Sequence, residues 1–432
     1  MDYQQSRAYV SDADRYAGGA LDLTNIKELM KRLGNPQDQL KYVHVAGTNG
    51  KGSVIAYLYT TLSEAGYRVG RYISPSVYSY REKMEVAGRS VSREQFAGYV
   101  TRVAAAIEEM TSEGLAHPTP FEIETAVAFL FFVEENCDLV ILEVGMGGNL
   151  DATNIIKNTI LAVLVPISMD HQSFLGNTLS EIAEKKAGII KPGCSVVTAG
   201  QQPETMAVIK NVCAQNNADL TEADLREAKA VKEDFAGQIL EYRGETFELS
   251  LAGSYQTENA ALALEALHVL EKKGYPTTVL QRKTGLKDTR WNGRLTIIHQ
   301  DPLFIVDGAH NPAAADMLED SVRKYFKGRK LFFIMGVFRD KDYPYIIRKL
   351  CPYAQQIVTV ETPDNPRALP AEELAGAIKP CNPNVQAAGS IEDAVNKVFD
   401  MAGCDDVILS FGSLSFIGQI TAIVKTREEK NS

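Results

Sequence analysis

Short apolar runs alternate with stretches of helical periodicity along the first two thirds of the chain. The clearest runs cover residues 41–45, 138–145 and 160–167. Continuous apolar runs of this length are typical of strands that are buried on both faces, as in parallel sheets. Helical patterns lie between or after them, over residues 54–62, 122–135, 180–187 and 257–273. This order predicts an α/β fold in which helices cover both faces of a parallel sheet.

Residues 228–252 follow a different pattern. Short stretches of alternating polar and apolar residues lie on either side of Arg243 and Gly244. Alternation around a turn of this kind predicts an antiparallel hairpin, inserted into the first domain or appended to it.

A second set of βα units follows the turn-like segment 290–294. Apolar strands are expected at 303–307, 330–335, 356–360 and 406–410, with amphipathic helices at 313–325 and 391–401 among them. We therefore expect a first domain over residues 1–295 and a smaller, doubly wound Rossmann-like α/β domain over residues 296–432. Ligands of such a sheet bind at the carboxyl ends of its strands. The charged tail 425–432 is the one segment of biased composition.

Composition narrows the class of protein. The 432 residues are 45% hydrophobic and carry a net charge of -10, which disfavours a nucleic-acid partner. No apolar stretch approaches the roughly 20 residues of a membrane span, and the N-terminus lacks signal-peptide features. The six cysteines have no CxxC spacing, so neither a disulfide framework nor a zinc site is indicated. We expect a cytoplasmic protein.

Residues 46–53, Ala-Gly-Thr-Asn-Gly-Lys-Gly-Ser, connect an expected strand to an expected helix. In that position a glycine-rich turn aims backbone N–H groups at a phosphate, and the helix N-terminus adds its dipole. Lys51 would neutralise the β- and γ-phosphates, and the Ser53 hydroxyl would join the Mg²⁺ shell. The pattern differs from GxxxxGK[ST] at Val45 and Gly52. The alternative is a glycine-rich turn that only permits close packing, but the context favours a P-loop ATPase domain.

Acidic and polar residues follow the next strands. Glu143 ends an apolar strand just before Val-Gly-Met-Gly-Gly, where an acidic metal or water ligand belongs in a P-loop protein. Asp170 and His171 follow the next strand and are expected at the same edge of the sheet. Ser74 opens a loop after a further strand, where composition alone indicates an ordinary turn serine.

Two further segments have a structural and a functional interpretation. Lys185 and Lys186 lie near the end of a helix with a glycine cap, where lysines favour the helix dipole. Residues 307–311, Asp-Gly-Ala-His-Asn, end a strand and precede a helix. They are suited to ribose or phosphate contact, although Asn311 is also a preferred N-cap residue. Residues 340–342 and 410–413 follow strands in the same way, with weaker signals.

Taken together, these segments resemble folylpolyglutamate synthase and dihydrofolate synthase, members of the Mur ligase superfamily. The matching segments follow the family's order over nearly the whole chain. They are 44–53, 121–122, 142–154, 170–171, 184–190, Asn259, 290–295, 307–311 and 412–414.

The resemblance implies an ATP-dependent amide ligase. A carboxylate of a reduced folate or dihydropteroate attacks the γ-phosphate of ATP, and the amino group of L-glutamate then displaces phosphate from the acyl phosphate. Charge neutralisation and a water-poor cleft are the physical requirements. The implied cofactors are ATP and two Mg²⁺ ions.

The resemblance also implies roles for individual residues. Phosphate binding falls to the loop residues Gly47, Thr48, Asn49, Gly50, Lys51, Gly52 and Ser53, and magnesium ligation to Ser53, Ser74, Glu143 and His171. Lys186 matches a lysine that the family carbamylates to hold a second metal. Nucleotide contacts across the domain cleft are implied for Asn259, Arg294, Asp307 and His310. Substrate contacts are implied for Phe121 and Asp151, which match pterin-holding positions, and for Lys83 and Ser413.

Several positions depart from the family pattern, and they concern the folate and glutamate pockets. Asn149 and Lys83 stand where arginine is usual, and Asn292 replaces a proline. Ser415 and Gln419 fall near a usual tyrosine and glutamate. Lysine cannot reproduce the bidentate fork of arginine on a carboxylate.

The leading interpretation is a monomeric, bifunctional dihydrofolate and folylpolyglutamate synthase, with either activity alone as the nearest variant. A ligase that acts on cell-wall nucleotide precursors is disfavoured, because only about 45 residues precede the phosphate loop, too few for a diphosphate-binding domain. A P-loop nucleotide switch without ligase activity is the alternative from another class. It predicts no ligand at residues 307–311.

Overall fold

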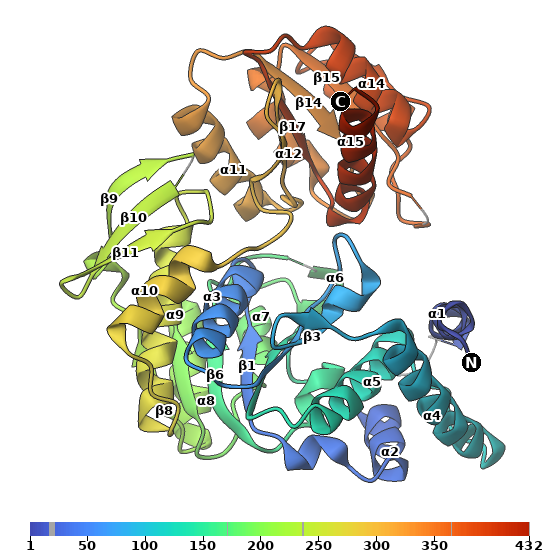
Figure 1. Ribbon diagram of the computed structural model, residues 1–432, viewed down its shortest axis with the longest axis vertical. Coiled ribbons are helices and arrows are strands. Elements are labelled where there is room, and N and C mark those ends of the chain that lie inside the picture. The colour runs from blue at the N-terminus through green and yellow to red at the C-terminus, as the bar shows by residue number, and fades with distance from the viewer. Residues whose placement is uncertain (17–21, 171, 236, 364, 432) are drawn as a thin grey trace.

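The computed structural model describes residues 1–16, 22–170, 172–235, 237–363 and 365–431, which form two α/β domains (Figure 1). The N-terminal domain is drawn in blue to yellow and the C-terminal domain in orange to red. The first is built on an eight-stranded sheet and the second on a six-stranded sheet. We propose residue 295, just before the second sheet begins, as the division between them.

The first sheet is parallel through its centre and antiparallel at one edge. Its order is β4-β3-β2-β5-β1-β6-β7-β8, and only β3 and β4 run against their neighbours. Every residue of β1 and β5 is buried, as the continuous apolar runs predicted. The strands are β1 (Tyr42–Ala46), β2 (Val69–Tyr72), β3 (Met84–Val86), β4 (Arg89–Ser90), β5 (Leu139–Glu143), β6 (Thr159–Leu164), β7 (Ser195–Thr198) and β8 (Asp219–Glu222).

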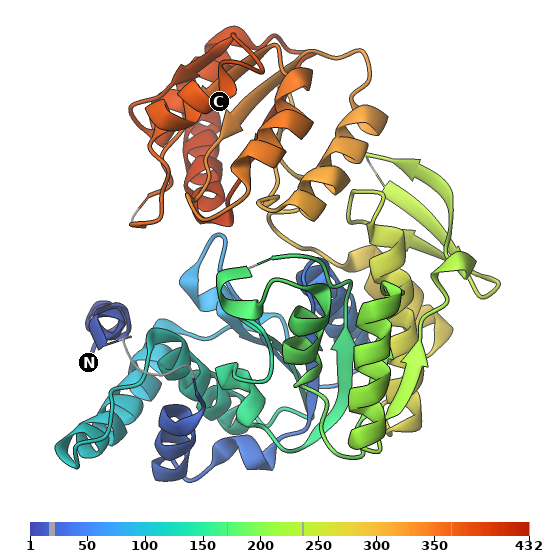
Figure 2. The same ribbon diagram turned by 180° about the vertical axis from the view of Figure 1, so that it is seen from behind.

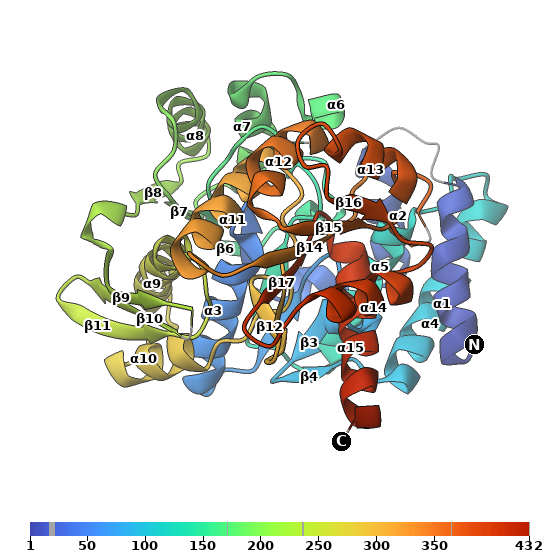
Figure 3. The same ribbon diagram turned by 90° about the horizontal axis from the view of Figure 1, so that it is seen from above.

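Helices cover both faces of this sheet. Val43 and Val45 pack with α3, α9 and α10 on one face, whereas Tyr42 and Leu142 pack with α1, α2, α4 and α5 on the other. Figure 3 shows α1 lying along α4. No helix in the described ranges is long and apolar enough to cross a membrane. The helices are α1 (Tyr3–Asp12), α2 (Thr24–Arg32), α3 (Lys51–Glu64), α4 (Arg93–Ser112), α5 (Pro120–Glu134), α6 (Gln172–Leu175), α7 (Leu179–Ala187), α8 (Pro203–Gln215), α9 (Gln256–Lys272) and α10 (Val279–Asp288).

The expected hairpin is part of a three-stranded antiparallel sheet. The strands are β9 (Lys229–Asp234), β10 (Gly237–Tyr242) and β11 (Glu245–Leu249), and β10 is central. The prediction missed β9 because its first four residues are exposed, so it has no buried apolar face. The sheet lies beside α9 and α10 (Figure 1).

The second sheet has the order β12-β13-β17-β14-β15-β16, with β12 antiparallel to the rest. The four central strands were predicted, whereas the short edge strands β12 and β16 were not. The charged tail is not a separate segment, because residues 425–431 continue α15. The elements are β12 (Thr296–His299), β13 (Leu303–Val306), β14 (Leu331–Met335), β15 (Gln356–Thr359), β16 (Val385–Ala387), β17 (Val407–Phe411), α11 (Pro312–Tyr325), α12 (Tyr343–Leu350), α13 (Ala371–Ile378), α14 (Ile391–Met401) and α15 (Ile417–Asn431).

The two domains face each other across the carboxyl ends of their central strands. Loops that follow β1, β2, β5 and β6 meet the linker and the loops that follow β13 and β17. Figure 2 shows the same arrangement from behind. Residues that lie hundreds of positions apart in the sequence therefore reach one site.

Candidate active site

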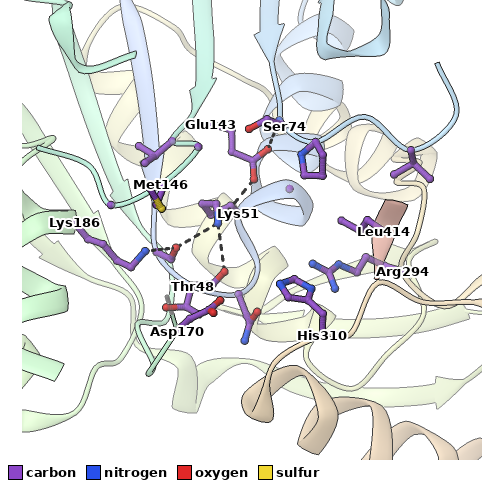
Figure 4. Close-up of a pocket in the computed structure, with 18 of the residues that line it drawn as sticks. Thr48, Lys51, Ser74, Glu143, Met146, Asp170, Lys186, Arg294, His310 and Leu414 are labelled. Carbon is purple, nitrogen blue, oxygen red and sulfur yellow. Dashed lines mark hydrogen bonds and ion pairs between the residues drawn. The ribbon is translucent and has the colours of Figure 1, made fainter. Parts of the chain in front are cut away.

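A cavity of about 160 Å³ lies between the two domains (Figure 4). The first domain contributes the loops after β1, β2, β5 and β6, and the second side contributes the linker, His310 and Leu414. Both sheets thus direct their carboxyl ends at one space, which is where α/β sheets bind ligands.

The glycine-rich loop occupies the floor of this cavity. β1 ends at Ala46 and α3 begins at Lys51, so the N–H groups of the first helical turn have no partner within the helix, and Lys51 and Gly52 of this turn line the cavity. Gly47 and Gly50 have φ angles of 141° and 99°, which side chains rarely allow. Lys51 Nζ donates to the carbonyl oxygens of Gly47 and Thr48, each at 3.3 Å. The loop has the form of a phosphate cradle with a lysine held above it.

Gly52, which departs from the usual P-loop pattern, has a tertiary explanation. A Cβ atom at this position would lie 2.2 Å from the ring of Trp291, so only glycine fits. Trp291 belongs to the linker between the domains and also lines the cavity. The other departure, Val45, is fully buried within β1.

Glu143 reaches the cavity from the end of β5. Its Oε2 accepts a hydrogen bond from the Ser74 N–H at 3.1 Å, and its Oε1 lies 4.0 Å from Lys51 Nζ. Burial raises the pKa of this carboxyl group, and the nearby Lys51 ammonium opposes that shift. The structure therefore brings Ser74, Glu143 and Lys51 together, as Figure 4 shows.

His171 lies outside the described residues, but its neighbour Asp170 is at the cavity. Asp170 forms an ion pair with Lys341 at 3.1 Å and accepts from the Asn311 amide at 3.1 Å. Lys341 and Asn311 both belong to the second domain. Residues 340–342 carried only a weak sequence signal, and the partner of Lys341 was not foreseen.

The side chains around Glu143 suit magnesium held together with a nucleotide. No three His, Cys, Asp or Glu side chains among the described residues form a ready-made metal site. Mg²⁺ is commonly held by one or two carboxylates, phosphate oxygens and water, and Glu143 with the Ser74 hydroxyl provides such a partial set. The Ser53 hydroxyl is buried on α3 and accepts from Gln256 Nε2 at 3.2 Å.

Lys186 is a buried residue of the site, not a surface lysine at a helix end. Its Nζ donates to the Gly47 carbonyl at 2.9 Å. Burial, followed by the charge of Lys51, lowers the pKa of its ammonium group to about 7. Lys185 instead points outward and donates to the Phe174 carbonyl at 2.6 Å.

This helix ends at a glycine cap, as predicted, but the glycine does not have the left-handed conformation that is usual there. Gly188 has a φ of -60°, in the right-handed helical region. A Cβ atom there would lie 2.4 Å from the Cβ of Asn149. Close packing of the 148–149 loop against α7 therefore explains the glycine.

Three of the residues predicted to contact a nucleotide across the domain cleft lie around a small cavity next to the first. Asn259, Arg294 and Asp307 line it with Tyr255 and apolar residues of α11. Asp307 accepts from the backbone N–H groups of Leu295 at 2.9 Å and Ala309 at 2.8 Å. This carboxylate thereby fixes the linker that carries Arg294.

Residues 308–311 include a helix cap and a residue that lines the main cavity. Asn311 caps α11, because its Oδ1 accepts from the Ala314 N–H at 2.9 Å. His310 lines the main cavity, and its Nδ1 lies 2.8 Å from the Gly308 carbonyl, so that nitrogen carries the proton. Burial, then the charge of Lys341, lowers the pKa of His310 to about 4, which leaves the ring neutral.

A third cavity, of about 510 Å³, adjoins the first. Phe121 and Asp151 line it, with residues of the N-terminal segment and of the loop before α5. It shares four lining residues with the first cavity: Ser74, Pro75, Gly145 and Met146. The two cavities therefore lie side by side, with these four residues between them or along both.

Lys83 and Ser413 line none of these three cavities. Lys83 Nζ pairs with both oxygens of the buried Glu124, at 2.8 and 2.9 Å. Ser413 Oγ lies 2.8 Å from Ser415 Oγ and caps the short helix at 414–416. In this conformation both side chains serve the protein's own structure.

Comparisons with known proteins agree with this architecture. Residues 45–267 match the Mur ligase middle domain, and residues 293–414 match the Mur ligase, glutamate ligase domain. The chain belongs to the Mur ligase family. Dihydrofolate synthase/folylpolyglutamate synthase of Bacillus subtilis is 34% identical over 98% of this chain and 99% of its own length. Folylpolyglutamate synthase of Lacticaseibacillus casei is 33% identical over 86% of this chain and 88% of its own.

Solved Mur ligase structures superimpose on nearly the whole chain. Folylpolyglutamate synthase of Mycobacterium tuberculosis, complexed with ADP and AMPPCP, has a TM-score of 0.87 at 31% identity and covers 98% of this chain and 99% of its own. An FPGS–AMPPCP–folate complex has a TM-score of 0.82 at 29% identity, with 99% and 100% covered. The predicted fold, a P-loop ATPase domain followed by a Rossmann-like domain, is confirmed.

Proposed function

We propose that the chain is an ATP-dependent ligase that joins the carboxylate of a folate or dihydropteroate to the amino group of L-glutamate through an acyl phosphate. One observation carries this: the phosphate-loop cavity adjoins the larger cavity, and Ser74, Pro75, Gly145 and Met146 line both. A carboxylic acid in the larger cavity can therefore reach the terminal phosphate of a nucleotide in the smaller one.

The first step is transfer of the γ-phosphoryl group. A carboxylate oxygen attacks the γ-phosphorus, and ADP leaves. The loop N–H groups and the Lys51 ammonium stabilise the charge on the phosphate oxygens. Glu143, Ser53 and Ser74 would hold Mg²⁺, with His171 as a further ligand by resemblance, and the metal would neutralise phosphate charge.

The second step is attack of the glutamate nitrogen on the acyl carbon, with phosphate as the leaving group. The mixed anhydride must survive until then, so water has to be kept away from it. The linker and the second domain can shield the anhydride from water, because the linker, His310 and Leu414 line one side of the cavity. The basic groups Lys51 and Arg294 in the same cavity suit the anionic reactants.

We further propose that Lys186 is carbamylated and holds a second metal. Carbamylation requires the neutral amine, and a pKa of about 7 makes that form abundant at neutral pH. The buried position beside the Gly47 carbonyl would place the resulting carbamate oxygens next to the phosphate loop.

The proposal includes two activities, with dihydropteroate and with a reduced folate as the acceptor. Phe121 and Asp151 lie in the larger cavity, at positions that resemble the pterin-holding residues of relatives that accept dihydropteroate. We also propose a cytoplasmic monomer. All six cysteines, which lie in the described part of the chain, are free thiols, as a reducing compartment requires.

The test is phosphate release from ATP, with dihydropteroate and a reduced folate assayed side by side as acceptors. Both acceptors should support release only when L-glutamate is present, with product formation confirmed by mass spectrometry. Activity with one acceptor alone would reduce the assignment to a single synthase. No glutamate-dependent release with either acceptor would favour a nucleotide switch.

A further inference from the structure

A chain of buried hydrogen bonds connects the phosphate-loop strand to the larger cavity. His44, on β1, has no exposed surface, and its Nε2 lies 2.8 Å from Thr153 Oγ1. Thr153 is also fully buried, and its Oγ1 lies 2.6 Å from Asp151 Oδ1. Neither His44 nor Thr153 lines the larger cavity, whereas Asp151 does. The mechanism proposed above uses neither of them.

The direction of each hydrogen bond follows from the chemistry of the groups. A carboxylate can only accept, so the Thr153 hydroxyl donates its one proton to Asp151 Oδ1. The hydroxyl must then accept from His44, which places the histidine proton on Nε2. The other ring nitrogen, Nδ1, is buried without a hydrogen-bond partner. Burial lowers the pKa of His44 to about 3, in agreement with this neutral form.

Thr153 saturates one oxygen of Asp151. Oδ1 accepts from the Thr153 hydroxyl and also from the Thr153 backbone N–H at 3.0 Å. Oδ2 accepts from the Met146 N–H at 2.9 Å. Thr153 thus fills both acceptor positions of Oδ1. Oδ2 lies beside the backbone of Gly145 and Met146, two residues that line both cavities, so it is the oxygen placed to meet a ligand there.

We propose that His44 and Thr153 are positioning residues that orient the Asp151 carboxylate, so that its Oδ2 receives an N–H group of the substrate's heterocycle. The inference deepens the proposed function and rests on it. His44 polarises the Thr153 hydroxyl from behind, and Thr153 prevents the carboxylate from turning. The nitrogen heterocycle of a pterin presents N–H donors along one edge, which is the ligand chemistry that such an oxygen recognises.

The test uses the near-isosteric pair Thr153→Val and Thr153→Ser in the full-length enzyme. Valine removes the hydroxyl, so we expect the KM for dihydropteroate and the Kd for pteroate to rise about tenfold. Serine restores the hydroxyl and should keep both values within about twofold of wild type. The KM for ATP and the Kd for ADP should stay unchanged in both variants, because the nucleotide contacts are untouched.

A second pair tests the histidine. His44→Gln retains an N–H donor and should bind pteroate more tightly than His44→Leu. This pair also keeps the proposal testable if Thr153→Val fails to fold. Far-UV circular dichroism and the Tm identify a variant that is merely unfolded.

Two outcomes would overturn the proposal. One is an unchanged pteroate Kd in Thr153→Val. The other is an equal loss of nucleotide and pteroate binding, which would assign the network to the phosphate loop instead. If the proposed function itself is wrong, the wild-type protein will not bind pteroate at all, and this result distinguishes the two failures.

Discussion

In the proposed mechanism, phosphoryl transfer depends most directly on Lys51. Its ammonium group is held by two carbonyl oxygens of its own loop and lies 4.0 Å from the Glu143 carboxylate. Lys51→Ala should lower kcat by about a hundredfold or more, because a preorganised charge at the phosphate is lost. Initial-rate kinetics measure this, with the exposed Lys41→Ala as control. Near-normal turnover in Lys51→Ala would refute the assignment.

Lys186 allows a test of the carbamate. Lys186→Ala should lose most activity and regain part of it when formate or acetate is added, because a small carboxylate can replace carbamate oxygens at the metal. Rates are compared at constant ionic strength against chloride. Lys185→Ala, at the outward-pointing neighbour, should show neither the loss nor the rescue. Indifference of Lys186→Ala to carboxylates would count against carbamylation.

His44 makes stability depend on pH. Its pKa is about 3 in the folded protein, because it is buried and lies near Lys191, whereas an ordinary histidine titrates near 6.5. Between about pH 6.5 and pH 3, His44 therefore binds a proton in the unfolded chain but not in the folded protein. The stability that the neutral, buried His44 contributes is fully present above the unfolded pKa and is lost as the pH falls below it. Between about pH 7.5 and pH 5 the wild type should lose about 2 kcal/mol through this residue.

The measurement is urea unfolding of wild type, His44→Leu and the control His268→Leu across that range. In His44→Leu, the free energy of unfolding should fall by about 2 kcal/mol less than in wild type between pH 7.5 and pH 5. His268, an exposed residue of α9, controls for the replacement of a histidine by leucine as such. Parallel slopes for all three proteins would show that His44 does not titrate on unfolding.

At the scale of elements, the start of α3 is set by a contact with the linker. Gly52 is the second residue of α3 and lies against the Trp291 ring. Gly52→Ala should destabilise the protein by about 1–3 kcal/mol, because the ring must move, and should weaken nucleotide binding at the displaced loop.

The matched control is the same substitution in a free helix surface. Gly98 lies inside α4, and a Cβ atom added there would meet nothing within 4 Å, so Gly98→Ala should stabilise the protein by about 0.5–1 kcal/mol. Chemical unfolding measures the change in stability of both variants, and isothermal titration with ADP measures the change in nucleotide affinity. A stabilised Gly52→Ala would contradict the steric argument.

At the scale of the molecule, the domains are joined by a small polar contact next to the nucleotide cavity. Asp170 of the first domain meets Lys341 and Asn311 of the second, and the Asp170 and Lys341 side chains are only 11% and 8% exposed. Asn311 also pairs with Asn49 of the phosphate loop at 3.3 Å. The contact therefore connects the second domain to the proposed phosphate loop.

Lys341→Met should shift the protein toward more open arrangements, because Asp170 then loses the ammonium group while the methionine keeps the volume. Small-angle X-ray scattering should show a larger radius of gyration. The control is Lys349→Met, since Lys349 pairs with Asp316 and Glu319 inside the second domain. An unchanged radius for Lys341→Met would remove this pair from the forces that hold the domains together.

Much of the site could be read from local sequence. A glycine-rich turn between an apolar run and a helix, and an acidic residue at the end of a buried strand, are signals that neighbours along the chain create. Lys51 and Glu143 were found in this way, as were the two α/β domains. Parallel strands must be apolar on both faces, so their pattern is visible without knowledge of the fold.

Other features were decided only when distant segments met. The residue pattern alone indicated only that Lys186 lies at a helix end, which it does, and burial against Gly47 makes it an inward-facing group with a lowered pKa. Gly52 and Gly188 are required because a side chain there would clash with Trp291 and Asn149, respectively. Lys83 forms an ion pair with Glu124. Sequence alone determined which segments form strands, helices and the phosphate loop, because those choices depend on near neighbours. Tertiary structure decided burial, charge state and partners, because these depend on contacts between residues far apart in the chain.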